Sequence, residues 1–333
     1  MRATSAAKPG APQGFTAAPP VRMRQPMPRA AALLADTPTV MRTGAWEDYE
    51  LIDSGGGRKL ERYGDYRVVR PEPQCLWRPR LADGDWAGAE AVFDPEGDED
   101  AGHWRFSRPL EQRWPMAWRD VRFFGRFTAF RHLGFFPEQA ANWAFLDEAV
   151  RGLGEGGRVL NLFGYTGVAS LVCAAAGAAV THVDASKRAI GWARENAELA
   201  GLQAQPIRWL CEDARRYVQR EVRRGSRYEG IILDPPKYGR GPNGEVWRLY
   251  EDLPELIGLC AELLSDQAKF LIANVYAERI SGLAVASLLR ETLGERGGRI
   301  DWGELALMES PLDGLGERGV GLSFFARWTR DPA

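Results

Sequence analysis

The sequence predicts an α/β fold, in which helices cover both faces of a mostly parallel sheet, preceded by a smaller β-rich domain. After Phe136, short apolar runs alternate with amphipathic stretches, which is the pattern of strands joined by crossover helices. Before Phe136, short runs are separated by Gly, Asp and Pro, as in β-hairpins. The last two apolar runs are joined by residues 309–321, which are too few for a crossover helix, so we expect these strands to pair antiparallel.

The individual elements are predicted from the length and periodicity of each run. Short apolar runs predict strands, and longer stretches with apolar residues three or four apart predict helices. Pro137 suits the first turn of the first helix. In chain order, we expect helix 137–153, strand 158–163, helix 168–177, strand 179–184, helix 186–201, strand 206–210, helix 214–222, strand 228–234, helix 248–264, strand 268–275, helix 282–294, strand 302–308 and strand 321–328. The predicted sheet therefore has seven strands.

Composition divides the 333 residues into three parts. Residues 1–45 are rich in Ala, Pro and Arg and sustain no helical or strand period, which predicts a disordered arm. Residues 46–133 are expected to form the small β-rich domain. Within it, residues 83–100 carry eight acidic residues together with Gly and Pro, which indicates a solvated loop. Residues 134–333 are expected to form the α/β domain.

Charge, hydropathy and cysteine usage exclude several classes of protein. The net charge of −2 means that any nucleic-acid site must be a local patch. No apolar run approaches ~18 residues, so we expect no membrane span. Three histidines and four cysteines (Cys75, Cys173, Cys211 and Cys260) are scattered without a CxxC, so no metal site is expected. This cysteine usage fits a reducing, cytoplasmic compartment.

Candidate functional residues come directly after the strands, because ligands of open α/β sheets bind beyond the carboxyl ends of the strands. The first strand leads into "NLFGYTGVAS", residues 161–170, where Gly164 and Gly167 allow a tight turn before the next helix. The segment is neither GxGxxG nor a phosphate loop, so a diphosphate ligand is disfavoured. An ordinary glycine-bearing turn is the alternative.

Acidic residues come after the next three strands. Asp184 lies twenty residues after Gly164, a spacing at which a carboxylate accepts hydrogen bonds from ribose hydroxyls. Asp213 is placed to accept from an adenine amine, with a helix cap as the alternative. Asp234 precedes Pro235 and Pro236, which lack N–H groups and offer only carbonyl acceptors, although Pro-Pro also marks a simple turn. Together the four strand ends predict a nucleoside site without a phosphate cradle, which favours S-adenosylmethionine over NAD or ATP.

The motifs "NLFGYTGVAS", "VDAS", "EDA" and "LDPPKYG" resemble those of class I S-adenosylmethionine-dependent methyltransferases, which have a Rossmann-like seven-stranded sheet. The upstream "LIDSGGGRKLERYGDYRVVRPEPQCLW" and "HLGFFPEQAANW" are similar to the bacterial group related to large-subunit ribosomal RNA methyltransferases, which has an N-terminal β domain. The resemblance implies S-adenosylmethionine as cofactor and catalysis at Asp234, Pro235 and Pro236. It implies cofactor contacts from Phe135, Phe136, Pro137, Gln139, Asn161, Phe163, Gly164, Tyr165, Thr166, Gly167, Asp184, Ala185, Ser186, Asp213, Ala214 and Asp234.

The residues around the predicted methyl-transfer point bear on the acceptor atom. Methylation at carbon 5 of cytosine needs a cysteine that adds to the base. Members of the family that methylate this atom carry that cysteine just after the fifth strand, where this chain reads "ANVYAERIS" from Ala273 to Ser281. Cys260 falls within a predicted helix and is expected to be core packing. We therefore expect transfer to nitrogen, with Lys237 and Tyr238 next to the substrate.

An arginine-rich aromatic stretch is the candidate RNA surface. Residues 104–131 hold seven arginines and eight Trp or Phe residues. Arginines meet phosphates and aromatic faces stack unpaired bases, so we expect ribosomal RNA contacts at Arg105, Arg119 and Arg122. A small β domain with aromatic residues inside and arginines outside is the alternative. A protein or small-molecule substrate, and a non-catalytic RNA-binding module, also stay open. The loop 309–321 is expected over the same rim, as a lid or a plain hairpin.

Overall fold

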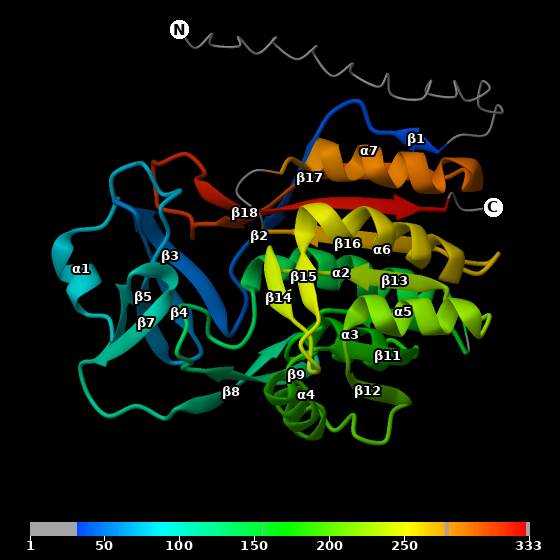
Figure 1. Ribbon diagram of the computed structural model, residues 1–333. Coiled ribbons are helices and arrows are strands. Elements are labelled where there is room, and N and C mark those ends of the chain that lie inside the picture. Colours follow the sequence, from blue (N-terminus) through cyan, green and yellow to red (C-terminus); the bar gives the residue numbers. More distant parts are fainter. Residues whose placement is uncertain (1–31, 155, 277–279, 331–333) are drawn as a thin grey trace, which may run out of the picture.

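The structure is a computed structural model that describes residues 32–154, 156–276 and 280–330. Most strands of the described part belong to a nine-stranded main sheet or a five-stranded smaller sheet, and the others form two separate hairpins (Figure 1). The first 31 residues of the predicted arm lie outside the described residues. None of the helices in the described part is long and apolar enough to cross a membrane.

The main sheet runs in the order β1-β17-β18-β16-β13-β10-β11-β12, and β2 also pairs with β17. Its strands are β1 (Leu33–Leu34), β2 (Thr39–Thr43), β10 (Arg158–Leu162), β11 (Ala179–Asp184), β12 (Ile207–Cys211), β13 (Gly230–Leu233), β16 (Phe270–Val275), β17 (Arg299–Met308) and β18 (Gly319–Thr329). All seven predicted strands are present, and β18 is antiparallel to both of its neighbours, as expected for the closing hairpin.

The sheet has nine strands rather than the predicted seven, because β1 and β2 add to it from within the segment predicted to be disordered. Both pair in parallel with β17, joining Leu33 to Arg299 and Thr39 to Gly303. The prediction of a disordered arm is therefore wrong for residues 33–43. These strands are too short to show a period in the sequence, and their only strand partner in the described part is β17.

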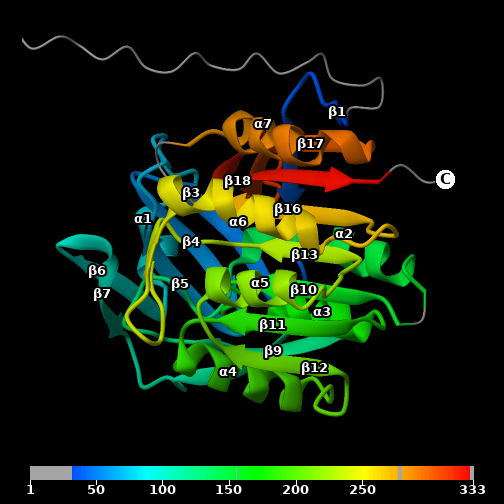
Figure 2. The ribbon, with the colours of Figure 1, turned by 45° about the vertical axis from the view of Figure 1, so that its right-hand side comes forward.

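Helices cover both faces of the main sheet, as predicted. They are α2 (Ala140–Arg151), α3 (Val168–Ala175), α4 (Lys187–Leu199), α5 (Ala214–Arg223), α6 (Leu249–Leu263) and α7 (Gly282–Leu293), with the 3-10 helix Pro137–Gln139 leading into α2. Side chains alternate along the strands, so Val159 packs in the core with α2 and α3, and Leu160 packs in the core with α5 and α6. Figure 2 shows α5 and α6 in front of the strands.

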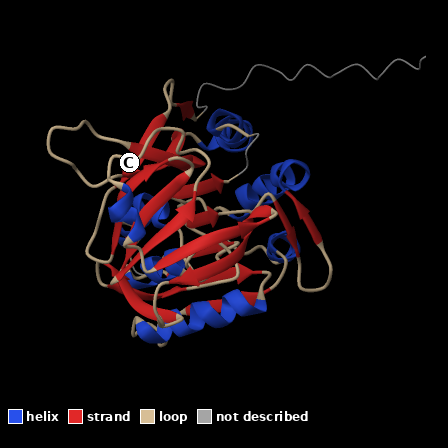
Figure 3. Cartoon of the chain, turned by 90° about the vertical axis from the view of Figure 1, so that its left-hand side faces the viewer, coloured by secondary structure: helices blue, strands red, loops and turns tan. Residues whose placement is uncertain are grey.

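The smaller sheet holds five strands and lies beside the main one in Figure 1; Figure 3 views the molecule from the side of this smaller sheet. Its elements are β3 (Tyr49–Gly55), β4 (Arg58–Tyr63), β5 (Tyr66–Pro71), the short helix α1 (Asp83–Ala87), β6 (Ala91–Glu96) and β7 (Asp98–Phe106), followed by the separate hairpin β8 (Arg113–Trp118) and β9 (Val121–Arg126). The predicted loop 83–100 is thus a helix and a strand pair. Ala91 and Phe93 are buried, whereas nearby acidic residues face outward. The prediction of a loop counted the acidic residues and did not consider this alternation.

The carboxyl ends of the parallel strands face the smaller sheet. In Figure 1 the β18 arrow points away from that sheet, and β16 is antiparallel to β18. One hydrophobic core joins the two sheets, since Phe135 contacts Tyr63 at 5.5 Å and Phe123 at 4.8 Å between ring centroids. The carboxyl ends of the parallel strands are therefore covered by the β-rich part of the chain.

Charged side chains fasten the β17–β18 loop to the smaller sheet. Arg318 donates to Glu309 at 2.8 Å, to Asp53 at 2.7 Å and to the Ser54 carbonyl at 2.9 Å. The Ser310 N–H donates to the Leu51 carbonyl at 2.9 Å. Asp53 and Glu309 are buried. The ends of the predicted lid are thus fixed, and the loop serves as a clamp between the sheets.

Candidate active site at the strand ends

The glycine turn after β10 has an unusual backbone. Phe163, Tyr165 and Gly167 have φ of 58°, 48° and 83°, all in the left-handed region. Gly164 differs from these residues because its φ is not positive. A glycine is needed here because there is no room for a side chain. A Cβ on Gly164 would stand 2.4 Å from Cε1 of His182. Gly164 therefore lets the turn rest directly on the His182 ring.

A buried polar trio supports this turn from below. Asn161 donates to Ser170 Oγ at 2.9 Å, and Ser170 Oγ lies 2.9 Å from Nδ1 of His182. Burial lowers the pKa of His182 to about 3, so the ring is neutral. The resemblance implies a cofactor contact for Asn161, and the structure places its amide in the core instead. No sequence pattern pointed to Ser170 or His182, since both lie within buried elements.

Asp184 ends β11 and ties the turn to the neighbouring strand. Its Oδ2 accepts from the Tyr165 N–H at 2.9 Å, and its Oδ1 accepts from the Ser186 N–H at 2.8 Å. Burial raises the pKa of the Asp184 carboxyl, and the two N–H donors oppose that rise. Ser186 caps α4 by accepting from Ala189 N–H at 3.2 Å. Ala185 lies between Asp184 and Ser186 in the chain.

Two more predicted residues hold local structure at the same edge. Asp213 Oδ1 caps α5 by accepting from Arg216 N–H at 2.9 Å, and Ala214 is the first residue of that helix. The Asp213 Oδ2 has no hydrogen bond to any described residue. Thr166 is buried and donates to the Gly134 carbonyl at 2.6 Å. Thr166 therefore fixes the turn to the segment that precedes α2.

Asp234 comes directly after β13 and has one buried carboxylate oxygen without a hydrogen-bond partner among the described residues. Its Oδ2 accepts from Gln139 Nε2 at 3.3 Å, but its Oδ1 is buried and has no hydrogen-bond partner in the described part of the chain. Burial, and secondarily the charge of Glu138, raise the pKa of Asp234 to about 7. A carboxyl group whose pKa is shifted this far by burial is typical of functional sites.

A buried network that the sequence did not predict orients Gln139. Its Nε2 donates to the Tyr276 hydroxyl at 2.8 Å, and its Oε1 accepts from Asn142 at 2.8 Å. Asn142 also donates to Asn274 at 3.0 Å. Burial raises the pKa of Tyr276 well above its usual range. The available signal was the polar "ANVY" ending of an otherwise apolar strand, Ala273 to Tyr276.

One of the two proline carbonyls is already engaged within the protein. Pro235 is buried, and the Pro236 carbonyl accepts from Trp247 Nε1 at 2.7 Å, so it does not face an incoming base. Trp247 belongs to a hairpin of β14 (Tyr238–Arg240) and β15 (Val246–Arg248), in a segment where the sequence predicts no helix or strand before Arg248. The hairpin leaves Lys237 and Tyr238 exposed at its base.

The segment before α2 divides between core and site. Phe135 is buried in the aromatic core and does not reach the strand ends. Phe136 lies 5.5 Å from Tyr276 and 6.0 Å from Tyr165 between ring centroids, and Pro137 begins the 3-10 helix that carries Gln139. Phe136 and Gln139 thus join the cluster around Asp234.

The three predicted RNA-contacting arginines do not converge. Arg105 pairs with Asp94 at 3.0 Å on the smaller sheet. Arg119 lies between β8 and β9 and pairs with Asp147 of α2 at 3.0 Å. Arg122 is exposed on β9. Within the described ranges, no group of three or more His, Cys, Asp or Glu is arranged to hold a metal ion.

Known proteins resemble this chain in sequence and structure. A family model described as S-adenosylmethionine-dependent methyltransferase matches residues 90–280. The crystal structure of the SAM-dependent methyltransferase from Agrobacterium tumefaciens is 51% identical, covers 90% of this chain and 96% of that one, and has a TM-score of 0.86. A Streptococcus mutans protein shares the fold at 19% identity, with a TM-score of 0.60 and coverage of 84% and 74%.

Curated relatives match a shorter segment. Ribosomal RNA large subunit methyltransferase K/L of Shewanella frigidimarina is 34% identical over 122 residues, which is 36% of this chain and 17% of that protein's length. The chain thus spans only a small part of these relatives. The family model covers more than half of the chain, and the Agrobacterium structure covers nearly all of it. This chain belongs to the S-adenosylmethionine-dependent methyltransferases.

Proposed function

We propose that the enzyme methylates a nitrogen atom of a base in ribosomal RNA, with Asp234 as the group that receives the acceptor amine. The observation that carries this proposal is the buried, unpartnered Oδ1 of Asp234, at the end of β13 and beside the glycine turn. A carboxylate oxygen of this kind accepts a hydrogen bond from an N–H donor. An exocyclic amine of a base supplies such a donor.

The strand-end residues fit S-adenosylmethionine. Each Asp184 oxygen uses one lone pair on a backbone N–H and keeps another for a ribose hydroxyl. Asp213 keeps Oδ2 for an adenine amine while its Oδ1 caps α5. The turn from Phe163 to Gly167 lies between these acids and Asp234 and would hold the methionine part.

The chemistry requires an oriented acceptor more than a strong base. S-adenosylmethionine supplies a methyl group activated by a sulfonium. Asp234 holds the amine so that its lone pair points at that carbon. With the cofactor bound, the nitrogen lone pair would form the new bond to that carbon while sulfur would keep the electron pair of the broken carbon–sulfur bond. Asp234 stabilises the positive charge that develops on nitrogen, and the excess proton leaves to its carboxylate. Gln139 fixes the orientation through Oδ2, which directs Oδ1 to the acceptor.

Transfer to carbon 5 of cytosine lacks its nucleophile here. Cys75, Cys173 and Cys260 are buried, and burial raises the pKa of each thiol. Cys211 is exposed at the end of β12, which is separated from β13 by β11 and β10. Three strand spacings put it about 14 Å away from β13. A thiol at that distance does not reach a base held by Asp234.

The choice of ribosomal RNA rests on the curated relatives, which are named for that substrate. The test compares modified nucleotides in ribosomal RNA, by mass spectrometry, from cells with and without the gene. We expect one N-methylated base to be lost on deletion and restored by the wild-type gene but not by Asp234→Ala. An unchanged set of modifications, with intact S-adenosylmethionine binding in titration calorimetry, would point to a protein or small-molecule substrate instead.

A further inference from the structure

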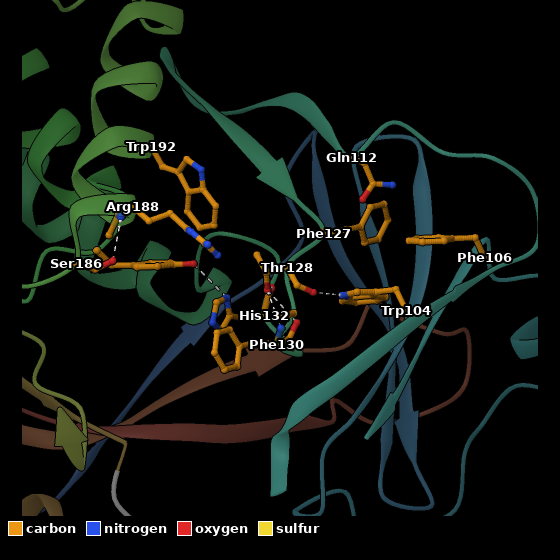
Figure 4. A pocket seen from close by; sticks show the side chains of 13 residues that line it. Trp104, Phe106, Gln112, Phe127, Thr128, Phe130, His132, Ser186, Arg188 and Trp192 are labelled. Carbon is orange, nitrogen blue, oxygen red and sulfur yellow. Dashed lines mark hydrogen bonds between the residues drawn. The ribbon is translucent and has the colours of Figure 1, made fainter. Parts of the chain in front are cut away.

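A cavity of about 610 Å³ lies next to the strand-end site, between the smaller sheet and α4 (Figure 4). Its lining comes from residues 104–132 on one side and from the first turns of α4 on the other. Tyr165 and Ser186 belong to both the lining and the predicted cofactor site. Asp213 and Ala214, which are expected at the adenine, do not line it. The cavity therefore adjoins the cofactor site without containing its adenine end.

Flat aromatic rings form much of the wall. Trp104 is held in place because its Nε1 donates to the Thr128 carbonyl at 2.9 Å, and its ring contacts Phe127 at 5.0 Å between centroids. Phe130 stacks on His132 at 5.5 Å with an interplanar angle of 18°. Phe130 is 48% exposed, so one of its faces is available to a ligand. Rings of this kind suit a planar heterocycle.

The charge in the cavity favours an anion beside that heterocycle. Arg188 reaches from α4 toward His132 (Figure 4). It stacks over Trp192 at 5.9 Å and forms no ion pair or hydrogen bond with any described residue. By contrast, the nearby Arg126 is bound to Glu195 at 2.6 Å. No lining residue is acidic. A planar heterocycle with an adjacent anion is a nucleotide.

Aromatic contacts also connect the cavity to the methyl-transfer centre. His132 lies 5.5 Å from Phe136, and Phe136 lies 5.5 Å from Tyr276. Tyr276 in turn accepts from Gln139, which holds Asp234. The ring of His132 is thus no more than about 11 Å from that of Tyr276. Nearby nucleotides of one strand span such a distance.

We propose that this cavity binds a second unpaired base of the RNA substrate, with Phe130 stacking on the base and Arg188 on its phosphate. This inference rests on RNA being the substrate. It explains how an enzyme with a net charge of −2 engages RNA, because stacking replaces a broad basic surface. It also relocates the RNA contact from Arg105, which lies on the opposite face of β7 from Trp104.

The test measures binding of a fluorescein-labelled, unstructured RNA of about ten nucleotides by fluorescence anisotropy, a length that covers one single-strand site. Phe130→Ala and Arg188→Gln change exposed side chains. Each is expected to weaken RNA binding about fivefold or more. Arg188→Gln should also lower the salt slope by about 0.7. The matched controls are Arg194→Gln, with the same charge change on α4, and Leu33→Ala, with an exposed apolar loss on β1. These controls should stay within about twofold of wild type.

Three outcomes overturn the inference. If wild type methylates RNA but both variants bind like the controls, the cavity does not hold a base, and the proposed function stands. If the variants instead lose affinity for S-adenosylhomocysteine, the cavity serves the cofactor. If a fully paired RNA of the same length binds equally well and is equally sensitive, the contact is to the backbone only. Failure of wild type to methylate any RNA removes the proposed function itself.

Discussion

Replacing Asp234 with asparagine is expected to stabilise the protein at neutral pH and to stop methyl transfer. The folded state holds the Asp234 proton more tightly than the unfolded chain, because its pKa rises from 3.8 to about 7. Stability therefore falls as pH rises from about 4 to about 7, and it stays lower above that range. Asparagine keeps the shape of the side chain but carries no charge, so the variant escapes this loss.

The magnitude comes from the size of the shift. About three pKa units at ~1.4 kcal/mol each give up to ~4 kcal/mol above pH 7. Asp234 as a residue is partly exposed, and solvent reduces this figure. In the asparagine variant a buried amide N–H without a partner replaces Oδ1, which destabilises the variant by ~1–3 kcal/mol and so reduces its gain. A net gain of ~1–2 kcal/mol is expected at pH 8, and a clearly smaller one at pH 5.

Urea denaturation at pH 5 and pH 8 measures this difference, with the exposed loop variant Asp313→Asn as control. Methyl transfer by Asp234→Asn should fall about a hundredfold or more, while cofactor affinity changes little. Equal stability differences at the two pH values would refute the reasoning, since they would mean that the carboxyl titrates alike in both states. Full activity in the variant would equally refute the role of Asp234 at the acceptor.

Two further substitutions test the supports of the site. Gly164→Ala places a methyl group 2.4 Å from His182 and should weaken S-adenosylhomocysteine binding about tenfold in calorimetry. The control is Gly191→Ala on α4, where the added methyl group meets open space. Equal affinity of the two variants for S-adenosylhomocysteine would show that the turn does not need a glycine at position 164. Arg318→Leu removes the ion pair of buried Asp53 and one of the two ion pairs of Glu309, which keeps Arg80 at 3.4 Å, and should cost ~1.5–3 kcal/mol in urea denaturation. Arg42→Leu breaks an exposed pair with Glu317 and should cost under ~1 kcal/mol, and a similar loss in both would show that the clamp contributes nothing special.

The fold and the strand-end acids are predictable because both depend on local patterns. Asp184, Asp213 and Asp234 each stand at or just beyond the end of a short apolar run, and parallel strands bring those positions to one edge. The bond from Gln139 to Asp234 joins residues 95 apart, and no local pattern encodes it. The contacts of Tyr276 with Phe136 and Gln139 likewise join residues 137 or more positions apart.

Other features escape prediction because partners elsewhere decide them. The Pro236 carbonyl is free to face a base as far as the sequence shows, but Trp247 from the next hairpin takes it. The arginines of residues 104–131 form a group by composition, whereas strand alternation and turns direct Arg105 and Arg119 to acids on separate elements. Pairing choices of this kind depend on which strands meet. Composition and periodicity do not contain that information.

The parallel pairing of β2 with β17 has a consequence for synthesis on the ribosome. Thr39 pairs with Gly303, about 260 residues later in the chain. At roughly 5–20 residues per second, β2 waits on the order of ten to fifty seconds for its partner to be translated. Strand β2 is thus incorporated into the main sheet only after β17 is made, whereas all strands of the smaller sheet are synthesised long before β17. The pairing of β2 in the main sheet therefore depends on a strand that is synthesised much later than β2 itself.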